Sequence, residues 1–433
     1  MAAQTFRTLM RTTDVIVTAL FSPAAVVAIG LADLYARFPL RIGLGLGGGA
    51  IALSSQDTGR GAAATRDEAV TQAVLLGALF GLPFAVAGLL FGDDLLALLG
   101  AGPTVTRLGG TYLAIVFVTA PARHVSLIAA RALQGTGDTR TPMYVNVVAN
   151  GVNIAGTVVL GLGLFGAPRL EIVGVGAATA AANVVTATAL CAAIRWTDTA
   201  AGFVRPRDPT IARQLLVVST PRIGEGVAAT LAEFPFNALL LGFGTAVNAG
   251  FQISRRMYQQ VTGPLGRGYH VASSVVVGQS LGEDDPDGAR FDGWAVTALG
   301  VATVGLVGLG LVFAADWFVR LLTDHPATVH YATRFAQVFG LVATFRVTFT
   351  VLSGALQGAG ETRVPFLART TGTFGFMLGV TYLAGEVLGH GPVGAYAGVG
   401  LSYLWMALVV AYGFRYGDWA GRAARMMAER ASG

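Results

Sequence analysis

The sequence contains no lysine, a single cysteine and few charged residues of any kind. Only 12% of its 433 residues are charged, whereas a soluble globular protein carries roughly 25%. Since 54% of the residues are hydrophobic and the mean hydropathy is +0.63, a soluble enzyme and a disordered chain are both excluded. Cys191 alone allows neither an internal disulfide nor a cysteine-based metal cluster. The composition is that of a protein that crosses the membrane many times.

Motifs of several enzyme classes are also missing. There is no HExxH pair for zinc, no GxSxG turn and no Walker loop. The run GLGLGGG at 43–49 lies inside an apolar segment and follows no strand, so it predicts close helix packing and not a nucleotide site. We therefore expect no enzyme activity and no cofactor. The arginines are spread over loops, which does not indicate binding of nucleic acid.

An internal repeat divides the chain. Residues 131–142 read RALQGTGDTRTP and residues 354–365 read GALQGAGETRVP, at an offset of 223. The same offset relates SSQDTG at 54–59 to VGQSLG at 277–282, and Arg123 to Arg346. Matches in separate loops at one offset indicate duplication, and they predict two domains, 1–205 and 206–433.

Each half offers six apolar segments. They lie near 8–31, 34–56, 70–92, 107–131, 143–165 and 174–196, and near 211–243, 247–278, 291–314, 328–353, 365–387 and 394–414. The predicted fold class is therefore an all-α integral membrane protein, with twelve transmembrane helices in two pseudo-symmetric six-helix bundles. An even number of spans gives both halves one orientation, with a pseudo-two-fold axis along the membrane normal, as is typical of transporters.

The loops also predict the orientation. One alternating set of loops holds about fifteen arginines and the other about three, so the arginine-rich side should face the cytoplasm. Both termini and the polar linker 194–214 fall on that side. The offset maps residues 211–218 to positions before Met1, so we expect a shortened first helix, and a start further upstream remains open.

Several loops resemble those of the MATE (multidrug and toxic-compound extrusion) family in the MOP flippase superfamily, prokaryotic type. ALQGTGDTRTP at 132–142, followed by MYVNVVANGVNI, is similar to the loop between the fourth and fifth helices of that family. ALQGAGETRVP at 355–365 is the counterpart in the second half. SSQDTGRG, VVVGQSLGEDDPDGAR and FRYGDW extend the resemblance in the correct order along the chain. Thr141 before Pro142 predicts a hydroxyl cap beside a proline at the first helical position.

The resemblance implies a function. Members of the family export organic compounds, mostly cationic drugs, by alternating access driven by inward Na⁺ or H⁺ flow. We accordingly expect a monomeric multi-pass protein of the cytoplasmic membrane that contacts lipid and small organic, cationic or amphipathic substrates. A flippase for lipid-linked oligosaccharide precursors is the alternative, since intramembrane arginines suit phosphates.

Asp14 is the candidate for the coupling carboxylate. It lies in the apolar stretch TTDVIVTALF, with no basic residue three or four positions after it. The resemblance places it at the family's helix-1 aspartate and matches Asn150 and Asn153 to helix-5 asparagines. Thr157 stands where the family has a second carboxylate. Asp14 would ligate the metal ion if coupling uses Na⁺, but the loss of one acid favours proton exchange.

Other charges inside the predicted spans need an explanation, because each costs a few kcal/mol or more in the bilayer. One interpretation is structural pairing, which for the two glutamates means Arg255 or Arg256. The other is binding of the coupling ion or a cationic substrate by the acids, and lining of a cavity or gate by the arginines. The candidates are Asp33, Arg37 and Arg41 on one stripe, Glu225 and Glu233 on one helix face, Arg255 and Arg256, and the repeat-related Arg123 and Arg346. His124 and His270 are expected to be hydrogen-bonded core residues, and Pro264 is expected to kink its helix.

Overall fold

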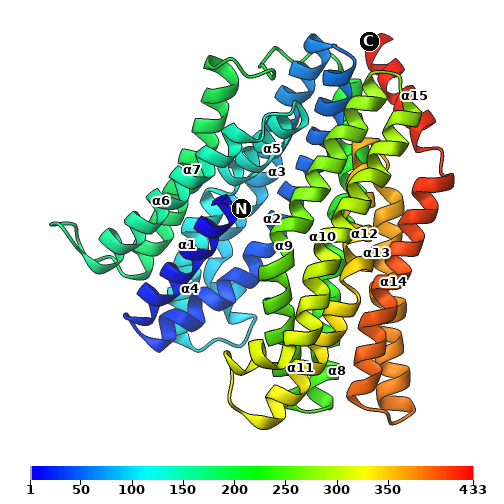
Figure 1. Ribbon diagram of the computed structural model, residues 1–433. Helices are drawn as coiled ribbons and strands as arrows, with labels where there is room; N and C mark the ends of the chain where they lie inside the picture. Colours follow the sequence, from blue (N-terminus) through cyan, green and yellow to red (C-terminus); the bar gives the residue numbers. More distant parts are fainter. Residues whose placement is uncertain (1, 433) are drawn as a thin grey trace. The chain divides into compact units, whose positions relative to one another are not determined.

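The computed structural model describes residues 2–432, with side chains from Leu9 onward. Within that range the chain is helical and contains no strand (Figure 1). The helices form two compact units. The first contains the chain up to Ser54 together with Ala62–Ser219, and the second contains Ser55–Gly61 together with Thr220–Ser432.

The helices of the first half of the chain are α1 (Ala2–Ala19), α2 (Pro23–Gly59), α3 (Ala63–Ala97), α4 (Pro103–Val118), α5 (Ala120–Gly135), α6 (Arg140–Leu162) and α7 (Ile172–Trp196). Those of the second half are α8 (Pro209–Gly242), α9 (Thr245–Gly282), α10 (Pro286–Arg320), α11 (Pro326–Leu341), α12 (Ala343–Gly358), α13 (Arg363–Thr371), the π-helices η1 (Gly372–Leu378) and η2 (Thr381–Val387), α14 (Pro392–Tyr416) and α15 (Trp419–Ser432).

The helix ends reproduce the repeat found in the sequence. Helices α3, α4 and α5 begin and end 223 residues before α10, α11 and α12. The last residues of α1 and α2 also precede those of α8 and α9 by 223. The duplication therefore extends over whole helices, and equivalent positions in the two halves can be compared directly.

One span in each half is broken at the equivalent residue. Helices α4 and α5 are bent by 47° at Thr119, and α11 and α12 by 50° at Val342. Pro121 lies near the first break only, so a proline is not the common cause. A close helix contact accompanies each break: a Cβ on Gly81 would come within 2.4 Å of Pro121, and one on Gly308 within 2.6 Å of Ala343.

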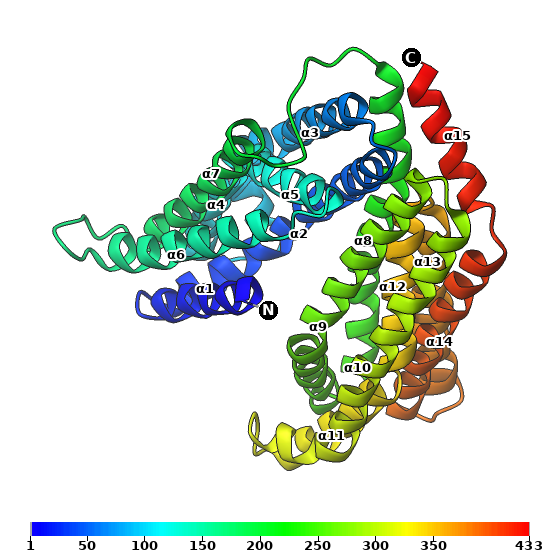
Figure 2. The ribbon, with the colours of Figure 1, turned by 45° about the horizontal axis from the view of Figure 1, so that its top comes forward.

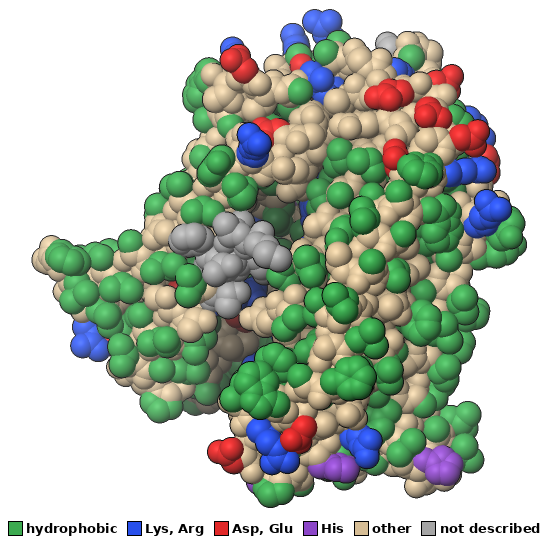
Figure 3. Space-filling model, viewed as in Figure 1, with side chains coloured by type: hydrophobic (Ala, Val, Ile, Leu, Met, Phe, Trp, Pro, Cys, Tyr) green, Lys and Arg blue, Asp and Glu red, His purple; other side chains and the backbone are tan. Residues whose placement is uncertain are grey.

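The helices are long and apolar enough for a membrane. Six qualify as spans, namely α2, α3, α6, α7, α10 and α14, and each bent pair adds one more. With α1, α8, α9 and the α13–η2 run they make the predicted twelve. Leu299, Leu306 and Phe313, seven residues apart on α10, are 59%, 72% and 87% exposed. In Figure 3, hydrophobic side chains cover the middle of the second unit and charged ones gather at its ends, as lipid contact requires.

The predicted boundary between the first two helices was wrong. The segment near 8–31 is not continuous, because α1 ends at Ala19 and α2 begins at Pro23. The Ser22 hydroxyl accepts a hydrogen bond from the backbone N–H of Ala25 at 3.1 Å. A serine cap followed by proline is a strong helix start, and it outweighs the continuous hydrophobicity of the segment.

The cap predicted at Thr141 was also wrong. Helix α6 starts at Arg140, and the Asp138 carboxylate accepts hydrogen bonds from the N–H groups of Arg140 and Thr141, both at 3.0 Å. In the second half Glu361 caps α13 in the same way, accepting from the N–H of Arg363 at 2.9 Å. A carboxylate satisfies the free N–H groups of the first turn and favours the helix dipole.

The fifth span differs between the halves. Helix α6 is α-helical throughout, whereas its counterpart is wound as a π-helix over η1 and η2. π-Helical turns are rare and accommodate an extra residue within a helix. The continuous α-helix expected near 365–387 is therefore interrupted. Pro264 lies inside α9, and this helix continues past the proline as one element from Thr245 to Gly282.

The C-terminal helix α15 is fixed to the second unit by buried polar contacts. Arg430 pairs with Asp57 at 2.9 Å, and both side chains have no exposed surface. Burial lowers the pKa of the Arg430 guanidinium, and the charge of Asp57 opposes that effect. Arg60 donates to the backbone carbonyl of Met427 at 2.7 Å. The segment Ser55–Gly61 thus belongs to the second unit, although the chain on both sides of it belongs to the first.

Candidate functional site

In the first unit, Asp14 meets a hydroxyl of another helix. Helices α1 and α6 pack against each other (Figure 2). The Thr157 hydroxyl on α6 is fully buried and donates to Oδ1 of Asp14 at 2.9 Å. Thr18 on α1 donates to the backbone carbonyl of Asp14 at 2.5 Å. The aspartate is half-buried, so one oxygen is held by Thr157 while the group remains accessible to a small cation.

Asn153 adds a second oxygen one turn from Thr157. It is 1% exposed, and its amide donates to the Thr179 hydroxyl on α7 at 3.2 Å. Its Oδ1 is buried and has no hydrogen-bond partner among the described residues. A buried unsatisfied carbonyl oxygen is costly unless something binds there. Asn150 instead donates to the backbone carbonyl of Asn146 at 2.7 Å.

The other charges of the first unit surround Asp33. Its carboxylate is exposed and lies in the field of Arg11, Arg123 and Arg37. It also repels Asp14, which Arg11 attracts. The two carboxylates therefore repel each other, and a cation bound at one of them removes this repulsion. This arrangement suits a site whose charge changes during a cycle.

His124 follows Arg123 and occupies a core position. Its ring nitrogens lie 2.7 Å from the Pro39 carbonyl oxygen and 3.2 Å from that of Gly77. The ring is fully buried and packs edge-on against Phe84. These contacts confirm the expectation of a hydrogen-bonded core histidine.

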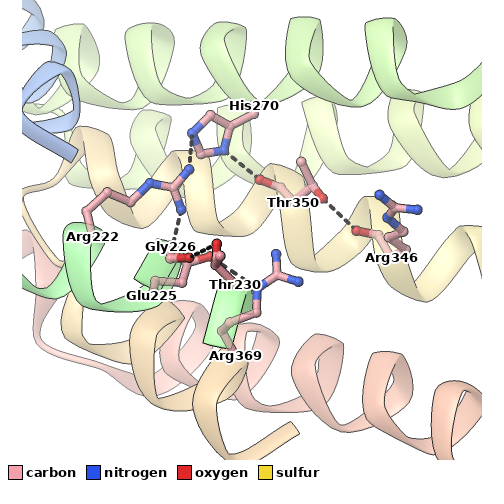
Figure 4. A network of polar contacts seen from close by, with 8 residues as sticks. All are labelled: Arg222, Glu225, Gly226, Thr230, His270, Arg346, Thr350 and Arg369. Carbon is pink, nitrogen blue, oxygen red and sulfur yellow. Dashed lines mark hydrogen bonds and ion pairs between the residues drawn. The ribbon is translucent and has the colours of Figure 1, made fainter. Parts of the chain in front are cut away.

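In the second unit, Glu225 is held by two arginines (Figure 4). It is 4% exposed, pairs with Arg222 on its own helix and lies 3.4 Å from Nε of Arg369 on α13. His270 Nδ1 lies 2.9 Å from the Thr350 carbonyl oxygen, so it carries the proton, and Nε2 faces Arg222 at 3.4 Å. A neutral imidazole satisfies both contacts.

Glu233 forms the second acid pair of this unit. It lies 3.2 Å from Arg255, as the sequence suggested, and both groups are about a quarter exposed. The pairing with Arg255 or Arg256 that the sequence left open for both glutamates holds for Glu233, whereas Glu225 pairs with Arg222 and Arg369. Glu225 lies two turns earlier on α8 than Glu233 and faces α13 instead of α9. The Arg256 side chain is exposed.

Two further guanidiniums rest on aromatic rings. Arg346 lies 4.6 Å from the ring centre of Tyr258 and 5.5 Å from that of Tyr403. Arg369 lies 4.4 Å from the ring centre of Phe349. Such contacts fix the plane of a guanidinium and leave its edge donors available.

Sequence reasoning missed the partners more than the acids. Arg369, Arg222 and Thr179 were not singled out in the sequence. The spacing of Arg222 and Glu225 by three residues was the available signal, since such residues are neighbours on a helix. Among the described residues, no group of three or more His, Cys, Asp or Glu side chains could hold a metal ion.

Comparisons with known proteins give a consistent result. The MatE family model matches residues 1–159 and 221–383. The multidrug resistance protein NorM of Burkholderia vietnamiensis is 30% identical over 351 residues, which cover 78% of this chain and 75% of that protein. A NorM protein of Rhodopseudomonas palustris is 29% identical over 416 residues, covering 94% and 87%.

Solved structures share the fold. A crystal structure of MATE in the bent conformation aligns with a TM-score of 0.88 at 18% identity, covering 99% of this chain and 94% of that one. An outward-facing multidrug resistance MATE transporter of the MOP superfamily aligns with a TM-score of 0.85 at the same identity and coverage. At this level of identity the likeness concerns the architecture alone.

Proposed function

Because the chain belongs to the MATE family of transporters, we propose that it is a secondary active antiporter that exports small organic compounds. Its relatives named NorM are multidrug resistance proteins. The substrates we propose are amphipathic compounds, cationic ones included, expelled by alternating access in exchange for an inward-moving cation. The hydrogen bond from Thr157 to Asp14, beside the unpartnered Oδ1 of Asn153, is the observation that carries the proposal.

We assign the coupling role to Asp14. A carboxylate that alternates between a charged and a neutralised state gives the two conformations different energies, which is what coupling requires. Thr157 positions one carboxylate oxygen, and Asn153 offers a carbonyl oxygen to the same cation. With a single acid in this group, we propose H⁺ as the coupling ion. If Na⁺ is used, Asp14, Thr157 and Asn153 would hold it.

Localisation and topology are part of the proposal. We place the protein in the cytoplasmic membrane as a monomer, with both termini and the arginine-rich loops on the cytoplasmic side. The positive-inside rule supports this orientation. We further propose that residues 1–205 and 206–433 form the two moving bundles, since the helix ends repeat between them.

A flippase for lipid-linked precursors is the second candidate. The arginines inside the second unit favour it, because guanidinium groups bind phosphates. The antiporter would move small organic compounds and depend on an ion gradient. The flippase would move a lipid-linked phosphate.

Transport by everted vesicles separates these possibilities. Vesicles with and without the protein receive a proton gradient or a sodium gradient separately, and uptake of a fluorescent amphipathic cation is followed. We expect uptake under the proton gradient alone. Uptake under neither gradient, together with translocation of a labelled lipid phosphate, would replace the antiporter by the flippase.

A further inference from the structure

In four helices of the second unit, the partly buried arginines outnumber the acids. From Thr220 onward, helices α8, α9, α12 and α13 contain two acids, Glu225 and Glu233. Arg363 stands at the exposed start of α13. Arg256 and Arg267 are exposed as well. The arginines of these helices that are at least partly buried are Arg222, Arg255, Arg346 and Arg369. Four positive charges and two negative ones leave a surplus of two.

Pairing does not remove this surplus. Arg255 is matched by Glu233, and Glu225 is shared between Arg222 and Arg369. No carboxylate of the described chain lies within ion-pair distance of Arg346, which contacts two tyrosine rings instead. A charge within the membrane needs a partner or water. A ligand of opposite charge would supply that partner.

Arg346 and Arg369 are the arginines best prepared to bind such a ligand. Both guanidiniums lie against aromatic rings, which hold them in place. Arg369 uses only Nε toward Glu225, at the long distance of 3.4 Å, and its two terminal nitrogens have no hydrogen-bond partner in the described part of the chain. Those two N–H₂ groups are free to donate to an anion.

The two guanidiniums also lie along the same helix. Arg346 is on α12, and Phe349, on which Arg369 rests, is three residues further. Arg346 and the ring that holds Arg369 are therefore neighbours about one turn apart on α12. Figure 4 shows Arg222, Arg346 and Arg369 entering this region from three different helices. Guanidinium groups donate paired hydrogen bonds to the oxygens of a carboxylate or a phosphate.

We propose that Arg346 and Arg369 bind an acidic group of the transported compound. This inference rests on the proposed export function and specifies its substrates as amphipathic molecules that carry a carboxylate or a phosphate, zwitterions among them. In the absence of a ligand, Glu225 is the carboxylate that pairs with Arg369. It stays paired with Arg222, while Arg369 exchanges its long contact to Glu225 for the ligand.

A matched pair of dyes tests the proposal. A rhodamine with a free benzoate and the methyl ester of the same dye differ only in the acidic group. Binding of each to the purified full-length protein is followed by fluorescence anisotropy. We expect the free acid to bind about tenfold more tightly than its ester, as one charge-assisted contact allows. Equal affinities, or a preference for the ester, would overturn the proposal.

Variants locate the site. Arg346→Gln and Arg369→Gln should each weaken binding of the free acid about tenfold and leave the ester within twofold. Arg425→Gln, on the exposed face of α15, is the control and should change neither. Arg369→Lys keeps the charge without the planar pair of donors, and it should bind the acid at intermediate strength. Uniform weakening of both dyes would mean a structural role and contradict the proposal.

Competition identifies the source of the acidic group. Benzoate and a short-chain phosphatidic acid are each titrated against the bound free-acid dye. Displacement by benzoate indicates soluble organic acids, and displacement by phosphatidic acid alone indicates a lipid headgroup; both support the anion site. No displacement by either contradicts it. Ion-driven vesicle uptake of the ester tests the export function independently, so the failure of one leaves the other standing.

Discussion

The two halves of the chain share most of their helix ends and both break points, but the polar residues of their candidate sites differ. At the offset of 223, Asp14 corresponds to Asn237, Asn153 to Phe376 and Thr157 to Val380. The second half therefore cannot rebuild the oxygen cluster of the first. Its buried acid, Glu225, corresponds at the same offset to Ala2. The repeated helices are thus retained in both halves, while the polar side chains at equivalent positions differ.

The polar residues of the two halves suit ligands of opposite charge. The first half holds an aspartate with a hydroxyl and an unsatisfied carbonyl, which suits a cation. The second half holds its acid between arginines and has a surplus of positive charge, which suits an anion. At one equivalent position the sign is even reversed, since Asp33 corresponds to Arg256. We therefore assign ion coupling to the first half and recognition of the substrate's acidic group to the second.

The largest effect on stability is expected at the buried pair Asp57–Arg430. The position equivalent to Asp57 is Ser280, so this contact exists on one side of the repeat only. Arg430→Met removes the fully buried partner of Asp57 and leaves the carboxylate only Arg60, at 3.0 Å, so it should cost about 3 kcal/mol. Thermal unfolding of the full-length protein in detergent measures it. Arg425→Met, whose pair with Asp418 is exposed, is the control and should cost less than about 1 kcal/mol; equal losses would refute the difference.

Removing the hydroxyl that holds Asp14 should impair transport next. Thr157→Val deletes a hydrogen bond to a charged group, which is worth about 1.5–3 kcal/mol, so ion-driven uptake should fall about tenfold or more. Initial rates in vesicles at several imposed pH gradients provide the measurement. Thr186→Val, whose hydroxyl contacts only a carbonyl of its own helix, is the matched control. If both variants transport equally, Thr157 has no part in coupling.

Two equivalent glycines should respond unequally. A Cβ on Gly358 would lie 2.2 Å from the backbone carbonyl oxygen of Ser274, whereas one on Gly135 would meet the Ser54 hydroxyl, which can rotate. Gly358→Ala should therefore destabilise the protein by about 1–3 kcal/mol, and Gly135→Ala by less. The melting temperatures of the two variants test this prediction. A larger loss for Gly135→Ala would contradict it and would mean that the backbone near Ser274 moves to accommodate the new methyl group.

The smallest effect concerns the duplicated caps. Asp138→Ala removes two hydrogen bonds to the start of α6 and should cost about 1 kcal/mol. Glu361→Ala removes the equivalent cap and also the ion pair to Arg422 at 2.8 Å, so its cost should be larger. Unfolding of both variants beside the wild type measures the difference, and identical costs would mean that the pair to Arg422 contributes nothing.

The sequence was sufficient for the scaffold because repetition and hydrophobicity are local signals. The offset of 223 and the arginine-rich loops predicted the duplication that the helix ends confirm. The breaks at Thr119 and Val342 were not predictable, since no local sequence signal is common to both. The turn at Ser22 was also missed, because the segment around it is hydrophobic throughout. The boundary between α1 and α2 is set there by the serine cap.

The candidate sites divide in the same way. Asp14 is visible in the sequence because an acid in an apolar run is costly. Its contact to Thr157 spans 143 residues and follows only from the packing of α1 on α6. Likewise Arg369, which no sequence pattern marks, contacts Glu225 across 144 residues. Long-range partners of charged groups require the tertiary structure.

The most direct test of the division between the halves is the variant Asp14→Asn in two assays. Ion-driven uptake is measured in everted vesicles, and binding of the free-acid rhodamine is measured with the purified protein. The account predicts that uptake under an imposed proton gradient is lost while dye affinity stays within twofold of the wild type. Undiminished ion-driven uptake by the folded variant would contradict it.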